Sequence, residues 1–397
     1  MLKPDTLALT VVLALLTALG PLSTDMYLPS LPAIAQEFGA TTGQAQLTLS
    51  AFLFGFAAGQ FFYGPVSDRV GRKPVLLFGL GLFTLASLVC ALAPTIEIMV
   101  AARFVQALGA SGPIVLGRAI VRDFYEGARA GRELSRMGTI MGLVPAVAPV
   151  LGGLIAAVSG WRVTFGVMIL CGAALAATVI WRLPESIRAK SEVPISFPSI
   201  LKGFGILLRH PGYRVYVALS MLAYGGLFAF ISGSSFVLQG HYGLTEIAFA
   251  FSFAVVVVGF IIGTTLAQRL VGPRGLDGTI RFGVACLALG GVLMLGTVAA
   301  GVPSSLAITG PMAVYGIGVG LTMPQAMASA LMPFPARAGA ASSLLGICQM
   351  TFAAILGILL GQGLGASALP LPAAVAATGV LALVVFRTTG RARSGKD

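Results

Sequence analysis

Charged residues are scarce in this sequence. Only 10% of its 397 residues are Asp, Glu, Lys or Arg, whereas about 25% is usual in soluble globular domains. Hydrophobic residues make up 57% of the chain, and the mean hydropathy is +0.96. Because so little charge cannot cover a surface that faces water, the composition indicates a membrane protein.

Cysteine and histidine are also rare, with four and two copies. The cysteines lie far apart, which excludes a disulfide framework and the spacing of a zinc site. No nucleophile and base are paired, and no glycine-rich loop ends in Gly-Lys-Ser/Thr as a phosphate-binding loop does. We therefore expect no metal, no cofactor and no enzyme activity, and a membrane enzyme is the weaker alternative.

Apolar stretches recur along the whole sequence. About 20 residues of helix cross a hydrocarbon core, and the sequence predicts an all-α membrane protein with twelve such helices. Their expected ranges are 7–28, 44–66, 74–93, 98–121, 134–158, 162–183, 213–238, 246–268, 279–300, 305–331, 338–360 and 370–387.

A polar, proline-containing stretch at 184–212 divides these spans into two groups of six. The prediction is an N-terminal six-helix half at 1–183, a cytoplasmic linker at 184–212 and a C-terminal six-helix half at 213–397. Many secondary transporters are built from such repeats, with the substrate site near the membrane midplane.

The positions of lysine and arginine predict the orientation. If both termini are cytoplasmic, every lysine and arginine except Arg103 and Arg162 falls on the cytoplasmic side or at its boundary, as the positive-inside rule requires. The net charge of +12 is then the positive-inside bias of a protein whose partner is the lipid bilayer, and it does not indicate nucleic-acid binding. We expect a multi-pass protein of a bacterial inner membrane that acts as a monomer.

One acid and one base lie deep within predicted spans. Asp25 is about 6 Å and Arg103 about 7 Å outward of the centres of the first and fourth spans, from the helical rise of about 1.5 Å per residue. Each costs at least about 2.5 kcal/mol to place in the membrane alone. Both should therefore face the protein interior or a wet cavity, at a shared depth.

Two interpretations of Asp25 and Arg103 remain open. The pair could be a structural ion pair that fastens two helices. Alternatively, Asp25 is a proton-coupling site, because burial and the neighbouring Arg103 act on its carboxyl in opposite directions and a ligand changes their balance. Such a carboxylate could exchange a proton for a substrate.

The segment "GPVSDRVGRKPV", residues 64–75, carries the most specific motif. It resembles the cytoplasmic loop between the second and third helices of the major facilitator superfamily. The resemblance implies a conformational gate between the two halves, in which basic residues meet Asp123 or Glu126. The matching gate residues are Gly64, Asp68, Arg69, Gly71, Arg72 and Lys73.

Further sequence motifs narrow the resemblance to one branch of this superfamily. "RFVQALGAS" from Arg103 resembles the superfamily's fourth-helix motif, although Ala107 replaces a glycine. "APVLGG" resembles an exporter motif through Pro149, Gly152 and Gly153, with close helix packing as the alternative. Together with "STDMYLPSLP", "RAIVRDFY", "WRVTF" and "AGAASSLLG", these resemble the bicyclomycin and chloramphenicol resistance (Bcr/CflA) exporters of the drug:H+ antiporter branch.

The resemblance also implies which residues meet a substrate. In the superfamily, helices 1, 4, 7 and 10 line a central cavity, and aromatic and methionine side chains suit an adaptable drug pocket. A lipid-facing position or core packing is the alternative for each aromatic residue. The candidates are Met26, Tyr27, Gln106, Met221, Tyr224, Phe228, Phe230, Tyr315, Met323 and Gln325.

The sequence therefore predicts a multidrug efflux transporter that exchanges protons for amphiphilic small molecules, such as phenicols or bicyclomycin-like compounds. Export of an endogenous metabolite such as an amino acid is the alternative within the same fold. A passive channel fits less well, because one acid and one base do not form a selectivity ring.

Overall fold

Helices account for almost all of the part of the chain that this computed structural model describes, namely residues 6–125, 127–187, 197–334, 337–364 and 367–394. Contacts divide the chain into two units. The first comprises Met1–Ala40 and Thr48–Ile195, and the second comprises Thr41–Leu47 and Ser196–Asp397.

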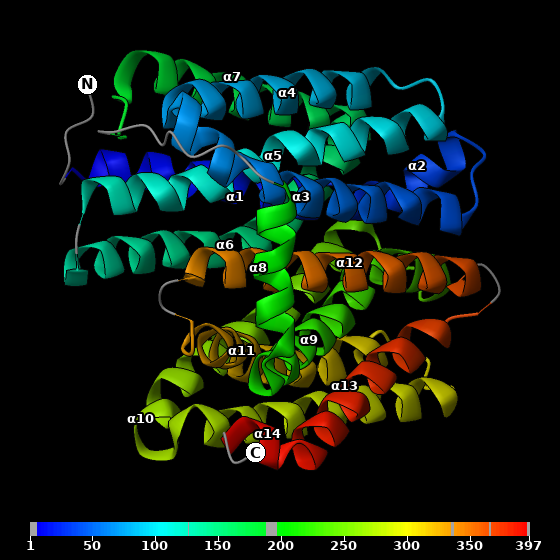
Figure 1. Cartoon of the computed structure of the whole chain (residues 1–397). Helices are drawn as coiled ribbons and strands as arrows, with labels where there is room; N and C mark the ends of the chain where they lie inside the picture. Colours follow the sequence, from blue (N-terminus) through cyan, green and yellow to red (C-terminus); the bar gives the residue numbers. More distant parts are fainter. Residues whose placement is uncertain (1–5, 126, 188–196, 335–336, 365–366, 395–397) are drawn as a thin grey trace. The chain divides into compact units, whose positions relative to one another are not determined.

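The first unit contains the longer part of α3 and seven further helical elements. Within it, α4 packs against α5 and α7, and α1 packs against α5 and α6 (Figure 1). The elements are α1 (Leu7–Asp25), η1 (Leu28–Ser30), α2 (Leu31–Glu37), α3 (Thr42–Val70), α4 (Arg72–Leu92), α5 (Ile96–Phe124), α6 (Gly127–Ser159) and α7 (Trp161–Arg182).

The second unit is built around α9 and α10. Helix α10 packs against α11 and α13, and α9 packs against α11, α12 and α13 (Figure 1). The elements are α8 (Phe197–Arg209), α9 (Pro211–Ser235), the π-helix η2 (Phe236–His241), α10 (Glu246–Ala299), α11 (Leu306–Leu331), α12 (Ala338–Leu364), α13 (Pro370–Thr388) and α14 (Gly390–Ser394).

The all-α prediction with long apolar helices is confirmed. Ten helices in the described ranges are long and apolar enough to cross a membrane. One of them, α10, holds two predicted spans in 54 residues and is interrupted at Gly275, whose φ of 67° and ψ of 179° are not helical. Helix α6 carries a shorter apolar segment at Val147–Ser159 and corresponds to the fifth predicted span.

The structure adds two details to the prediction. The stretch 184–212, predicted to be a linker, contains the helix α8 (Phe197–Arg209), which packs against α9 and α12; the part at 188–196 lies outside the described residues. The first candidate span extends over Leu7–Glu37, which includes the predicted 7–28; within it α1 ends at Asp25, and η1 and α2 continue the span. Pro29 and Pro32 follow Asp25, and prolines lack the backbone N–H that a continuing helix requires.

Glycines allow close helix contacts in the second unit. A Cβ atom added to Gly259 or Gly263 on α10 would overlap the backbone of Ala313 or Ile317 on α11. Membrane helices gain stability from such close packing, because lipid tails are as apolar as the side chains and burial alone drives little association.

We predict opposite effects for two alanine substitutions in α10. Gly263→Ala should destabilise the protein by about 1–3 kcal/mol, because the added methyl group forces helices apart. Gly296→Ala should be neutral or stabilise by up to about 1 kcal/mol, since alanine favours a helix and an added Cβ meets no atom within 4 Å. Thermal unfolding of both variants in detergent measures the difference, and equal midpoints would contradict the packing role of Gly263.

Candidate functional site

The first candidate membrane span, Leu7–Glu37, changes from α-helix to a turn and a 3₁₀ helix directly after Asp25; we call this change the break. Helix α1 ends at this residue, and the chain re-forms helical turns in η1 and α2. Asp25 is buried, with 6% of its surface exposed. Within the described residues its carboxyl group makes no hydrogen bond or ion pair. A short 3₁₀ stretch inside a longer helix often marks a functional hinge, and here it follows a buried carboxyl, so this region is a candidate functional site.

Arg103 reaches the end of α1 from α5. It is fully buried, and its Nη1 donates to the backbone oxygen of Ser23 at 3.1 Å and to Oε1 of Gln106 at 2.6 Å. Its guanidinium carbon lies 4.7 Å from the ring centroid of Tyr27 and 4.4 Å from that of Phe52. These aromatic faces attract the cation in a dry environment.

Arg103 and Asp25 do not form an ion pair in the described structure, although both belong to the region around the end of α1. Arg103 instead contacts the carbonyl two residues before Asp25, and its Nε and Nη2 atoms have no hydrogen-bond partner among the described residues. The structural ion-pair alternative finds no support in this geometry. The proton-coupling role stays a prediction.

A polar chain continues from Arg103 across the first unit. Gln106 receives the bond from Arg103 and donates its own Nε2 to Oγ of Ser87 on α4 at 2.7 Å. The hydroxyl of Tyr27 is hydrogen-bonded to Thr48 on α3. Of the substrate candidates in this unit, Gln106 and Tyr27 thus have internal polar partners, which orient them beside the break.

The exporter-like segment packs against the same break. A Cβ atom added to Gly152 on α6 would overlap the carbonyl oxygen of Met26, the residue that follows Asp25. Pro149 and Gly153 are buried on the same helix. The glycine at position 152 therefore allows α6 to cover exposed backbone at the end of α1.

The segment 64–73 was expected to be a loop, but it consists of the end of α3, Gly71 and the start of α4. Charges hold it within the first unit. Nη1 of Arg72 lies 2.5 Å from Asp68, and its Nε lies 3.0 Å from Oδ2 of Asp123 at the end of α5. The contact with Asp123 is the one expected from the sequence, whereas Glu126 lies outside the described residues. Arg69 is exposed, and an added Cβ at Gly64 would have no close neighbour within its unit.

Gly71 is the single residue between α3 and α4. Its φ of 120° lies in the region that favours glycine, and it leaves room for Glu185. This carboxylate accepts hydrogen bonds from the backbone N–H groups of Arg72 at 2.9 Å and Lys73 at 3.1 Å. Glu185 thus caps the first turn of α4, where a negative charge also interacts favourably with the helix dipole.

Sequence reasoning missed Glu185 and Glu133. Glu185 lies 112 residues beyond Lys73, so the sequence gives no direct sign that the two meet. The only signal was that Glu185 is an acidic residue among basic ones. Glu133 on α6 is buried and accepts hydrogen bonds from Thr10 on α1 at 2.7 Å and from Arg136 at 2.6 Å. It precedes the predicted fifth span by one residue, and span boundaries are the least certain part of a sequence prediction.

The remaining substrate candidates lie on α9 and α11 of the second unit. Tyr315 is fully buried, and its hydroxyl contacts the backbone oxygen of Leu222 at 3.3 Å and Oγ1 of Thr378 at 3.2 Å. The ring of Phe230 stacks on Phe253 at 5.7 Å. These contacts favour the packing alternative for Tyr315 and Phe230.

The other candidates make fewer contacts with neighbouring side chains. Tyr224 and Phe228 stack on each other with ring centroids 6.3 Å apart. Met323 accepts a hydrogen bond from Nε2 of Gln349 at 3.2 Å. Partial exposure within the second unit keeps three of them as candidates for ligand contact: Met221, Tyr224 and Met323. Phe228 and Gln325 are buried.

Removal of the cap on α4 should lower stability. We predict that Glu185→Ala costs about 0.5–2 kcal/mol, the usual range for a lost helix cap. Glu185→Gln should cost less, because its amide oxygen still accepts one hydrogen bond. Unfolding midpoints in detergent should decrease in the order wild type, Glu185→Gln, Glu185→Ala. An unchanged midpoint for Glu185→Ala would rule out the capping role.

The contact between α6 and the break gives a second prediction. Gly152→Ala should destabilise the protein by about 1–3 kcal/mol, because the methyl group meets the rigid backbone of Met26. Gly166→Ala on α7 is the matched control, since an added Cβ there has no atom within 4 Å. Thermal unfolding of both variants provides the comparison, and equal stability would show that α6 does not need a glycine here.

The sequence is similar to transporters along nearly its whole length. An MFS-type transporter of Bacillus subtilis (strain 168) is 34% identical and covers 99% of this chain and 98% of its own length. A bicyclomycin resistance protein homolog of Haemophilus influenzae is 31% identical, with 97% and 96% covered. A chloramphenicol resistance protein of Pseudomonas aeruginosa is 33% identical, with 81% and 76% covered.

A solved structure supports the same fold. A D-xylose-proton symporter superposes with a TM-score of 0.76 over 95% of this chain and 96% of its own, at 16% sequence identity. The family model described as Major Facilitator Superfamily matches residues 13–358. With its two units of helices, the motif at 64–73 and these relatives, the chain belongs to the Major Facilitator Superfamily and is a membrane transporter rather than an enzyme.

Proposed function

We propose that this transporter exports amphiphilic drugs, of the phenicol or bicyclomycin class, in exchange for protons across a bacterial inner membrane. It acts as a monomer with both termini in the cytoplasm. The names of its relatives support the substrate class, and the distribution of lysine and arginine supports the orientation.

The observation that carries proton coupling is the position of Asp25. It is a buried carboxyl at a break in a membrane span and has no ionic partner in the described structure. The charge on such a group depends on whether water or a ligand reaches it. Asp25 can therefore bind a proton from one side of the membrane and release it to the other as access alternates.

Arg103 and Gln106 complete the proposed coupling site. The guanidinium is buried against aromatic rings and bonded to the backbone beside Asp25, so it supplies a fixed positive charge. In the inward-facing state, the ionised carboxylate and a bound drug are present together. In the outward-facing state, protonation of Asp25 accompanies release of the drug.

The energetics suffice for efflux. One elementary charge that moves through 100 mV releases about 2.3 kcal/mol, which corresponds to a concentration ratio of roughly 50-fold for an uncharged drug exchanged for one proton.

Of the candidates in the second unit, Met221, Tyr224 and Met323 are proposed to contact the drug. The ion-paired segment of Arg72 and Asp123 is proposed to act as the conformational gate.

The test is transport in proteoliposomes with an imposed pH gradient and a phenicol as substrate. The wild-type protein should accumulate or expel the drug according to the gradient. Asp25→Asn should reduce transport to the rate measured without a gradient, because an amide cannot exchange the proton.

Glu97→Gln serves as the matched control, since Glu97 is an exposed acid on α5 outside the proposed site. It should transport as the wild type does. Gradient-driven transport that persists in a folded Asp25→Asn variant would sink the coupling role, and wild-type indifference to the gradient would favour a uniporter.

A further inference from the structure

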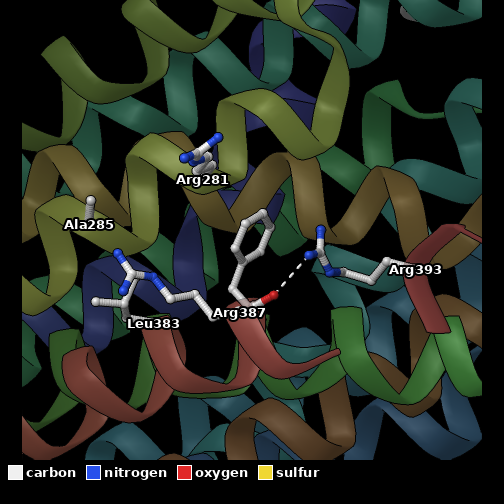
Figure 2. Close-up of a pocket in the computed structure, with 6 residues that line it drawn as sticks. Arg281, Ala285, Leu383, Arg387 and Arg393 are labelled. Atoms are coloured by element: carbon white, nitrogen blue, oxygen red, sulfur yellow. Dashed lines mark hydrogen bonds between the residues drawn. The ribbon is translucent and has the colours of Figure 1, made fainter. Parts of the chain in front are cut away.

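A pocket in the second unit is lined by three arginines from three separate stretches of chain. It has a volume of about 280 Å³ and lies between the second part of α10, the last turn of α13 and the short helix α14. Its lining residues are Arg281, Ala285, Leu383, Phe386, Arg387 and Arg393. Figure 2 shows the arginine side chains around this hollow.

Arg393 is held in place by several contacts. It forms an ion pair with Asp277, and its Nη2 donates to the backbone oxygen of Phe386 at 2.8 Å (Figure 2). Its guanidinium carbon lies 3.7 Å from the centroid of the Phe386 ring. Only 8% of the Arg393 side chain is exposed, and its buried Nε has no hydrogen-bond partner among the described residues.

The other two arginines have no protein partner. Arg281 and Arg387 are exposed, and neither makes a hydrogen bond or an ion pair within the described ranges. Asp277, which does not line the pocket, is engaged by Arg393 and by the hydroxyl of Tyr216 at 2.8 Å. Three guanidinium groups against one carboxylate leave an excess of positive charge, which an anionic ligand would neutralise.

A second hollow extends this positive surface. It has a volume of about 560 Å³, shares Arg281 with the first pocket and is also lined by Arg274, Gly278 and Phe282. The guanidinium carbon of Arg274 lies 4.5 Å from the ring centroid of Phe282. A ligand larger than a single inorganic ion therefore has room along this surface.

The surface next to the arginines is strongly apolar. On α10, Phe282 is 42% exposed and Leu289 is 54% exposed, and on α13 Leu381 and Val384 are 50% and 47% exposed. In a membrane protein, large apolar side chains exposed along spanning helices face the lipid tails. Positive charge thus lies where an apolar, lipid-facing surface meets the ends of the helices.

The geometry points to a binding site for an anionic phospholipid, with its phosphate held by Arg281, Arg387 and Arg393 and its acyl chains along the apolar faces of α10 and α13. Guanidinium groups bind phosphate oxygens in a bidentate manner, and basic pockets between membrane helices are suited to anionic head groups. This site lies in the second unit and involves none of the residues proposed for drug and proton coupling.

Native mass spectrometry of the full-length purified protein tests the site. The protein in detergent is titrated with palmitoyl-oleoyl phosphatidylglycerol or with the zwitterionic phosphatidylcholine of the same chains, and lipid adducts are counted. The wild type should prefer phosphatidylglycerol. A double variant, Arg281→Gln with Arg387→Gln, should lose about tenfold or more of that preference, because each arginine near an anionic surface contributes a factor of about five.

Two further variants make the result specific. Arg209→Gln with Arg214→Gln removes the same charge from exposed positions of the second unit outside the pocket and should keep the preference. Arg281→Lys with Arg387→Lys retains the charge and should keep more of the preference than the Gln variant does.

Three outcomes would overturn the lipid site. The first is a wild type without any preference for phosphatidylglycerol. The second is an equal loss of preference in the pocket variant and in the control with changes at 209 and 214. The third is displacement of phosphatidylglycerol by millimolar inorganic phosphate at equal affinity, which would show that the pocket recognises the free anion and not the lipid.

Discussion

The structure of the candidate site depends on one constraint of the bilayer: backbone polar groups that leave a helix must be covered by protein or water. Helix α1 breaks after Asp25, and two neighbours cover the break. Gly152 brings the backbone of α6 against Met26, and Arg103 from α5 donates to the carbonyl of Ser23. These contacts satisfy or shield the backbone on both sides of Asp25, whose carboxyl has no ionic partner among the described residues.

Arg103 illustrates why the absence of an ion pair is informative. A salt bridge to Asp25 would fasten α1 to α5 and hold the carboxylate in its charged form. Instead, the guanidinium is bonded to a neutral carbonyl and to Gln106 and lies against aromatic faces. The positive charge of Arg103 is thus held by a carbonyl, an amide and aromatic rings, and not by the Asp25 carboxylate.

Each unit also contains a glycine junction stabilised by charge. In the first unit, Gly71 joins α3 to α4, and Arg72 is held by Asp123 while Glu185 caps the helix. In the second unit, Gly275 interrupts α10, and Asp277 two residues later is held by Arg393. Acidic side chains surround the first junction, whereas arginine side chains surround the second. The second junction therefore carries an excess of positive charge, which is the basis of the proposed anion site.

The sequence by itself determined that the chain is a helical membrane protein, since low charge and apolar runs of about 20 residues permit little else. It also contained the family-specific motif at 64–73. It singled out Asp25 and Arg103, because a charge inside a span is conspicuous against an apolar background. Only the tertiary structure decided that these two do not pair, that Glu185 caps α4 from 112 residues beyond Lys73, and which contacts Tyr315 and Phe230 make. Likewise, only the folded chain brings Arg281, Arg387 and Arg393 around one pocket. The physical reason is that membrane insertion is governed by local composition, whereas hydrogen bonds, caps and pockets depend on which faces of distant helices meet, and nearly uniform apolar helices carry little pattern that specifies those faces.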